Sequence, residues 1–128
     1  MFLNTQIQFL TIEKSCIKIW EFFQGNFELI KRIHIKQNIR QCVISEMTDF
    51  MLILGENGKL LILDNTGEFV STVSADNVFF TTIGTANDKL LLGTEKGTIH
   101  VYHMASLHFV SEIPYQMALL SSNALNST

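Results

Sequence analysis

The chain repeats one stretch of sequence three times, as Ser15-Cys16-Ile17-Lys18-Ile19-Trp20-Glu21, Gly58-Lys59-Leu60-Leu61-Ile62-Leu63-Asp64 and Gly97-Thr98-Ile99-His100-Val101-Tyr102-His103. Each copy follows a tight polar turn and has the composition of a β-strand. The copies start 43 and 39 residues apart, close to the period of roughly 40–45 residues that is typical of a four-stranded propeller blade. The spacing therefore predicts an all-β fold of antiparallel blades. It does not name a function, because propellers host both binding and catalysis.

Composition and charge narrow the class of protein. The 128 residues are 47% hydrophobic with a mean hydropathy of +0.24, enough apolar material for the core of one domain. Nine Lys and Arg residues face twelve Asp and Glu residues, and no run of five or six like charges occurs. Binding to nucleic acid through phosphate contacts is therefore not expected.

The cysteines and the apolar runs bear on location. Cys16 and Cys42 are too few for a disulfide framework and form no Cys-x-x-Cys pair, which favours a reducing, cytoplasmic compartment. The start, Met1 to Gln6, lacks the basic region of a signal peptide. No run approaches the 18 or more apolar residues of a spanning helix. We expect neither secretion nor a membrane partner.

Strand and turn signals divide residues 1–115 into three blade units, residues 7–35, 39–74 and 78–114. Asn57-Gly58 is the strongest hairpin signal, since such turns need positive φ angles that Asn and Gly tolerate. Residues 116–128 lose strand character and form a tail, a linker or the start of a further blade. The predicted strands are Ile7–Ile12, Cys16–Phe22, Phe27–Ile35, Ile39–Ser45, Phe50–Gly55, Lys59–Asp64, Glu68–Ser74, Val78–Ile83, Lys89–Thr94, Thr98–His103 and Leu107–Ile113.

The strand count leaves the fold open. Met51–Leu54, Leu60–Leu63 and Leu90–Leu92 are continuous apolar runs, expected of strands covered on both faces, whereas Phe27–Ile35 alternates like a half-exposed outer strand. Three, four and four strands make about two and three-quarter blades, and closed propellers have roughly four to eight. An open wedge would expose large apolar faces. We expect the remaining blades of a longer chain, a completing assembly or self-association to cover them.

The ends of the three repeats carry a family resemblance. Trp20-Glu21, Leu63-Asp64 and Tyr102-His103 stand where WD-repeat proteins have a Trp-Asp dipeptide, so the chain resembles a degenerate WD-repeat protein over nearly its whole length. Only the first copy keeps the Trp, and no Gly-His dipeptide precedes a first strand. Glu21 and Asp64 are expected to bind backbone amides at the strand ends.

Within that superfamily, Ser106 to Pro114 is similar to the mitogen-activated protein kinase-binding protein type of scaffold, as are the stretches around Phe9-Leu10-Thr11 and Leu91-Leu92-Gly93. This resemblance implies a non-enzymatic scaffold for kinase-pathway proteins at centrosomes, spindle poles or cilia. The alternative is a cytoskeletal WD-repeat component associated with microtubules, centrioles or cilia. Neither implies a cofactor.

Candidate chemistry is sparse. His100 and His103 are three residues apart on one predicted strand and point to opposite faces, so they cannot share a metal ion, and His108 is the remaining neighbour. Cys16 and Cys42 are predicted to be small packing residues. No glycine-rich phosphate loop is present. We also expect one aromatic set to pack between blades rather than bind a ligand: Phe69, Phe79, Phe80, Tyr102, Phe109 and Tyr115.

The candidate binding site is a rim of hairpin turns. The turns that precede the three repeated stretches should gather at one end of the blades, and they share a mixed Glu and Lys character suited to a protein partner. Simple solvation of exposed hairpins is the competing interpretation. The candidate residues are Glu13, Lys14, Glu56, Asn57, Lys59, Glu95 and Lys96.

Overall fold

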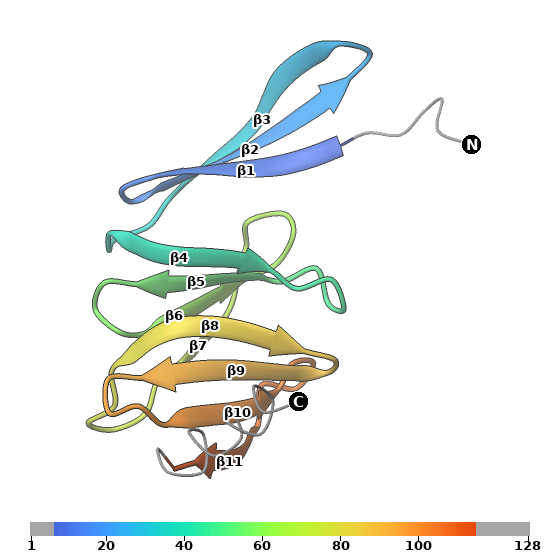
Figure 1. The fold of residues 1–128 in the computed structure, drawn as a ribbon. Helices are drawn as coiled ribbons and strands as arrows, with labels where there is room; N and C mark the ends of the chain where they lie inside the picture. Colours follow the sequence, from blue (N-terminus) through green and yellow to red (C-terminus); the bar gives the residue numbers. More distant parts are fainter. Residues whose placement is uncertain (1–6, 115–128) are drawn as a thin grey trace, which may run out of the picture. The chain divides into compact units, whose positions relative to one another are not determined.

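The computed structural model describes residues 7–114, which form eleven strands and contain no helix (Figure 1). None of these residues therefore belongs to a helix that could cross a membrane. The strands make three antiparallel sheets. The first sheet contains β1 (Ile7–Glu13), β2 (Cys16–Phe23) and β3 (Asn26–His34); the second contains β4 (Ile39–Ile44), β5 (Met51–Gly55), β6 (Leu60–Leu63) and β7 (Phe69–Val73); the third contains β8 (Phe80–Ala86), β9 (Lys89–Thr94), β10 (Ile99–His103) and β11 (Phe109–Ile113).

The chain divides into two compact units, residues 1–39 and residues 40–128. The first unit contains the three-stranded sheet, and the second contains the two four-stranded sheets. In every sheet the strands lie in chain order, so each neighbour is reached through a short connection. The predicted blade units at 7–35, 39–74 and 78–114 correspond to the three sheets. The predicted tail at 116–128 lies outside the described residues.

A β-bulge marks the same place in all three sheets. The strand that carries the repeated stretch is β2, β6 or β10. Its register against its outer neighbour shifts between Ile19 and Trp20 in the first sheet, between Ile62 and Leu63 in the second and between Val101 and Tyr102 in the third. Each shift falls directly before the dipeptide on which the repeat was aligned. Because a bulge twists and bends its strand, the common position gives the three sheets the same local shape.

The turns differ in how they meet the demand for positive φ. The β2–β3 turn has two such residues, Gln24 at 52° and Gly25 at 81°, as in a type I′ hairpin. In the β5–β6 turn only Gly58 has a positive φ, of 77°, and its N–H donates to the Gly55 carbonyl at 3.0 Å. Asn57 instead accepts a hydrogen bond from the Lys59 N–H through Oδ1 at 3.2 Å. The hairpin was predicted, but the two-residue positive-φ turn was not correct there.

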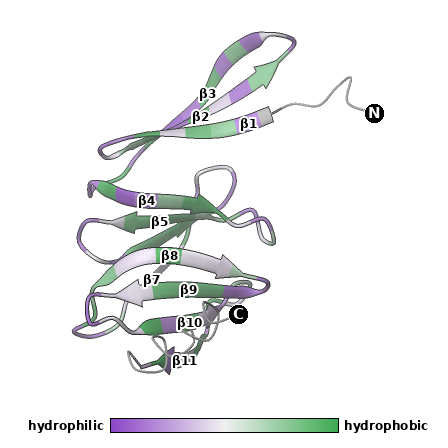
Figure 2. Cartoon of the chain, viewed as in Figure 1, coloured by the Kyte–Doolittle hydropathy of each residue, from purple (hydrophilic) through white to green (hydrophobic). Residues whose placement is uncertain are grey.

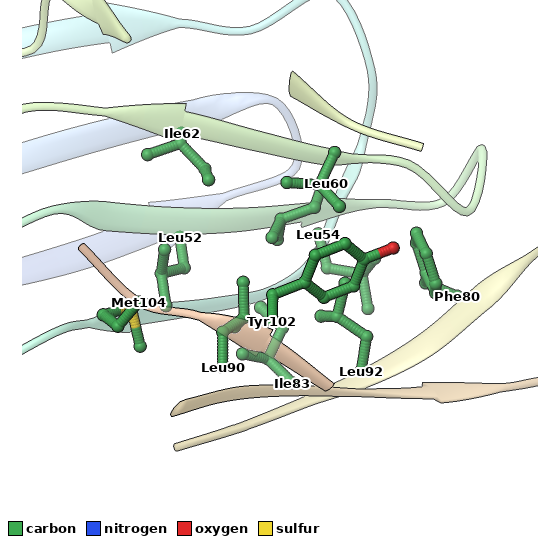
Figure 3. Packing of buried hydrophobic residues seen from close by; sticks show 11 residues of the cluster. Leu52, Leu54, Leu60, Ile62, Phe80, Ile83, Leu90, Leu92, Tyr102 and Met104 are labelled. Atoms are coloured by element: carbon green, nitrogen blue, oxygen red, sulfur yellow. The ribbon is translucent and has the colours of Figure 1, made fainter. Parts of the chain in front are cut away.

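The core of the second unit lies between its two sheets (Figure 3). Every residue of β5 is buried, and the predicted apolar runs on β5, β6 and β9 supply most of the core (Figure 2). The cluster comprises Leu52, Leu54, Leu60, Ile62, Val73, Phe80, Ile83, Leu90, Leu92, Tyr102 and Met104.

One predicted strand is displaced. The sequence suggested Val78–Ile83, whereas β8 runs from Phe80 to Ala86. Val78 forms an isolated bridge with Ala75, to whose carbonyl it donates at 3.1 Å, with Asn77 between them at a φ of 58°. Because Val78 belongs to this local turn, β8 begins only at Phe80.

Candidate functional site

The candidate rim residues of the second unit lie on two hairpin turns with one backbone pattern. In residues 55–59 the Gly58 N–H donates to the Gly55 carbonyl at 3.0 Å, and in residues 94–98 the Gly97 N–H donates to the Thr94 carbonyl at 3.0 Å. Gly58 and Gly97 have φ angles of 77° and 80°. The side chains of Glu56, Asn57, Lys59, Glu95 and Lys96 are all exposed.

These two turns are fastened to the same segment. The Phe80 N–H donates to the Gly58 carbonyl at 2.9 Å, and the Glu95 N–H donates to the Phe79 carbonyl at 3.0 Å. The segment between β7 and β8 therefore bridges the turn of one sheet and the turn of the next. A glycine is required at position 58 for two reasons: its φ is positive, and an added Cβ would overlap the Phe79 ring.

An open hollow of about 540 Å³ lies beside this junction. Lys59 of one turn and Glu95 of the other line it, together with Asp76, Asn77 and Phe79. The Arg40 guanidinium carbon lies 5.9 Å from the centre of the Phe79 ring, within the range of a cation–π contact. The residues that line the hollow thus include an aromatic side chain and charges of both signs.

The third predicted turn belongs to the other unit. Glu13 and Lys14 are exposed, and the Glu13 carboxylate lies 3.6 Å from the Lys18 ammonium. Lys14 has a φ of 53°, and its carbonyl accepts a hydrogen bond of 2.7 Å from the Ile39 N–H. The structure brings the turns at 55–59 and 94–98 together, while the turn at Glu13 and Lys14 is described only within its own unit.

A smaller cavity of about 80 Å³ contains His100. This side chain is only 6% exposed, and its Nε2 lies 3.4 Å from Glu112 Oε2. Its Nδ1 has no hydrogen-bond partner among the described residues. Thr94 and Thr98 also line the cavity, so it has the size and polarity to hold a few water molecules.

The structure also locates the candidate histidines and cysteines. His100 is buried and His103 exposed, which confirms that they face opposite ways. Within the described range, no group of three or more His, Cys, Asp or Glu residues could hold a metal ion. Cys16 in the first unit and Cys42 in the second are free thiols, and burial raises the pKa of Cys42 to about 11.

The prediction for the strand-end acids is half right. Asp64 Oδ1 accepts from the Thr66 N–H at 2.8 Å and from the Glu68 N–H at 3.0 Å, which closes the turn after β6. Glu21 instead lies inside β2, opposite Gln8 and Glu28. The β2 strand continues beyond the repeat because the type I′ turn that ends it comes only after Phe23.

The aromatic set divides in the same way. Phe80 and Tyr102 are buried as predicted, and Phe79 is half-buried. Phe69 and Phe109 are 64% and 54% exposed, because they stand on the outermost strands, so packing between blades was wrong for them. Tyr115 lies outside the described residues.

Sequence reasoning missed a second hollow, at the opposite end of the second unit. It has a volume of about 680 Å³ and is lined by the β4–β5 loop, Asn87 of the β8–β9 turn and Met104 of the β10–β11 loop. Met47 at 60% and Ile44 at 47% are exposed apolar side chains there. The available signal was Met47 within the polar stretch Ser45-Glu46-Met47-Thr48-Asp49, where a loop keeps an apolar residue.

Comparison with solved structures identifies the fold. The chain is similar to apo AztD from Citrobacter koseri, with a TM-score of 0.64 and 22% identity over 84% of this chain and 32% of that chain. It is also similar to the dihydro-heme d1 dehydrogenase NirN in complex with DHE, with a TM-score of 0.69 and 17% identity over 88% of this chain and 28% of that one. Both are propellers. The fold is a partial β-propeller.

The three sheets are therefore propeller blades, and the chain spans about a third of the length of these structures. At such identities the likeness shows the fold alone. AztD and NirN are not WD-repeat proteins. No protein-family model and no curated protein matches the chain.

Proposed function

We propose that these blades form a rigid platform for binding another protein, without a catalytic step, through the two hairpin turns at residues 55–59 and 94–98. The observation that carries the proposal is the shared anchoring of both turns. Backbone hydrogen bonds of 2.9 and 3.0 Å tie them to Phe80 and Phe79. Loops fixed on a stiff scaffold can present side chains without the entropic cost of ordering them on binding.

The chemistry of the hollow suits a protein surface better than a small ligand. Its charged walls, Lys59, Asp76 and Glu95, are exposed side chains. Sites for small molecules enclose most of the ligand and are lined mainly by apolar groups. A half-buried aromatic ring surrounded by exposed charges resembles the centre and rim of a protein interface instead.

We further propose that the blades are of the degenerate WD-repeat type. The support is positional: Trp20, Leu63 and Tyr102 each directly follow the bulge of their own sheet. Asp64 in addition closes its turn through two backbone amides. A scaffold for kinase-pathway proteins is the first candidate role, and a component associated with microtubules, centrioles or cilia is the second.

A charge reversal at the rim tests the binding proposal. Glu95→Lys changes a carboxylate at the hollow, and Glu68→Lys is the matched control, an exposed carboxylate of the same unit that lines none of the hollows described above. Proteins captured from cell extract by the wild-type chain and by Glu68→Lys should be retained about tenfold less by Glu95→Lys, which corresponds to about 1.4 kcal/mol. Equal capture by all three chains contradicts the rim as the binding surface.

Co-sedimentation with purified microtubules separates the two roles. Pelleting that Glu95→Lys weakens and Glu68→Lys preserves favours the cytoskeletal role. Absence of pelleting, together with rim-dependent capture of protein kinases, favours the signalling scaffold. Because the contacts are exposed charges, either interaction should weaken as salt rises.

A further inference from the structure

Two loops of the second unit have the same backbone conformation. In each, the first N–H donates to the carbonyl five residues later at 2.9 Å, and the N–H four residues later donates back to the first carbonyl at 2.8 Å. The first residue is Ser45 in the β4–β5 loop and His103 in the β10–β11 loop. The fifth residue has a positive φ in both, 60° at Asp49 and 62° at Leu107. The two loops are therefore equivalent residue by residue.

The side chains of the two loops agree at one position and differ at another. The fourth residue, Thr48 or Ser106, accepts the N–H of the sixth through its hydroxyl oxygen at 3.4 Å in both loops. The third residue is exposed in both, and it is Met47 in one loop and Ala105 in the other. Because Ala occupies that position in the same backbone conformation, the loop does not need the Met47 side chain for its own structure.

Met47 lines the hollow of about 680 Å³ at this end of the second unit, called the Met47 hollow from here on. Ile44 lines it too, so two exposed apolar side chains share one concave surface and do not lie scattered singly. Met104 and Ser45, which are 1% and 3% exposed, are the buried members of the lining. The volume falls within the range of binding pockets, about 300–1,000 Å³.

The charge around the Met47 hollow is negative. Among the described residues that line it, Glu46 alone is charged. Asp49 of the same loop is also exposed, and within the described range neither carboxylate forms an ion pair. Asp88 follows the lining residue Asn87, and its carboxylate pairs with the Lys89 ammonium at 2.9 Å. A partner that complements this end therefore carries a positive charge.

We propose that the Met47 hollow binds a segment of a partner protein in which an apolar side chain stands next to a Lys or an Arg. The apolar side chain packs against Ile44 and Met47, and the basic group faces Glu46 and Asp49. The flexible, polarizable thioether of a methionine adapts to apolar side chains of different shape. An apolar centre with charges at its rim is also the usual anatomy of a protein interface. This site lies at the opposite end of the unit from the rim turns and does not depend on their role.

Methionine-methyl NMR of the full chain, titrated with short synthetic peptides, tests the proposal. The probe is acetyl-Ala-Leu-Arg-Ala-amide, and its matched control is acetyl-Ala-Leu-Glu-Ala-amide. The Met47 and Met104 methyl signals should shift with the basic peptide with a Kd of about 1 mM. The acidic peptide should bind about fivefold more weakly, because its carboxylate meets carboxylates. Equal affinity for the two peptides, or no shift with about 10 mM of the basic one, overturns the proposal.

Two variants locate the contacts. Met47→Ala should weaken binding of the basic peptide about tenfold, read at the Met104 methyl, because the apolar contact is lost. The equivalent loop already has an Ala at this position, so the variant should fold. Glu46→Gln should weaken binding of the basic peptide about threefold, and the exposed control Glu68→Gln should leave it unchanged. Full affinity in Met47→Ala, or equal losses in Glu46→Gln and Glu68→Gln, overturns the assignment.

Two further measurements separate this site from other occupants and from the rim. Without peptide, the Met47 methyl signal should not change as the chain is concentrated. A shift that grows with protein concentration means that a second copy occupies the hollow, and it overturns the proposal. Glu95→Lys, which alters the rim at the other end, should bind the basic peptide as the wild type does. Loss of peptide binding in Glu95→Lys contradicts a separate site, so the test of the hollow and the test of the rim can fail independently.

Discussion

Replacing Gly58 by Ala should lower the free energy of unfolding by more than a substitution in a hairpin turn usually does. A non-glycine residue at a φ of 77° pays about 1–2 kcal/mol for the left-handed backbone. The new Cβ would also overlap three atoms of the Phe79 ring, and overpacking of this kind typically adds about 1–3 kcal/mol. We expect Gly58→Ala to lower the free energy of unfolding by about 2–5 kcal/mol.

A double-mutant cycle separates the two contributions. In a Phe79→Ala background the ring is gone, so Gly58→Ala should cost only the backbone part, about 1–2 kcal/mol. Gly25→Ala is a second control, since Gly25 has a φ of 81° and nothing within 4 Å of an added Cβ. It should cost the same backbone part.

Urea unfolding followed by circular dichroism is the appropriate assay, because Trp20, the single tryptophan, lies in the first unit and would not report on the second. The packing argument predicts a coupling of about 1–3 kcal/mol between Gly58 and Phe79. If Gly58→Ala costs the same with and without the Phe79 ring, the junction between the two turns is not packed as described, and the rigid rim loses its basis.

Predictions at three further residues test other parts of the second unit. Phe80 is 0% exposed, so Phe80→Ala should cost about 3–5 kcal/mol in urea unfolding, and a loss below about 1 kcal/mol would contradict its burial. Gln41 accepts from the Ile83 N–H at 3.0 Å and donates to its carbonyl at 3.3 Å, so Gln41→Ala should cost about 1–3 kcal/mol, while the exposed control Gln37→Ala should cost under about 0.5 kcal/mol. Burial raises the pKa of the Cys42 thiol from its ordinary value of 9.0 to about 11, so we expect slow alkylation by iodoacetamide in the folded chain and fast alkylation in urea, read by mass spectrometry. The unfolded thiol ionises first, so stability should fall as pH rises from about 9 toward 11, and a pH-independent stability there would contradict the assignment.

The repeat could be predicted from sequence because its determinants are local. Gly58 and Gly97 fix two of the turns, and the apolar runs that follow them, such as Leu60–Leu63, fix the buried strands. The position of each turn then determines which residues of the two neighbouring strands pair. The equivalence of Trp20, Leu63 and Tyr102 was predicted from spacing alone, and the bulges fall beside all three.

Features that depend on contacts between sheets could not be read in this way. The late start of β8 reflects the bridge between Ala75 and Val78, a choice between two local pairings that the apolar composition of the segment does not reveal. Gln41 reads as an ordinary polar residue of a strand, yet it hydrogen-bonds Ile83 on the neighbouring sheet. Likewise, alternation alone could not show that Phe69 and Phe109 stay exposed on the outermost strands.

The two ends of the second unit are under different constraints. The turns at 55–59 and 94–98 share their length and the position of their glycine, and both are hydrogen-bonded to the segment Phe79-Phe80. At the other end, the β4–β5 loop spans six residues from Ser45 to Phe50, while the equivalent β8–β9 connection is the short turn Asn87-Asp88. Constraint at the first end makes it a precise frame, and the freedom at the second allows the exposed Met47 to appear in only one blade. A partner that tells this chain from other propellers would therefore read the variable end as well as the charged rim, and the Glu95→Lys variant should weaken such a partner without abolishing its binding.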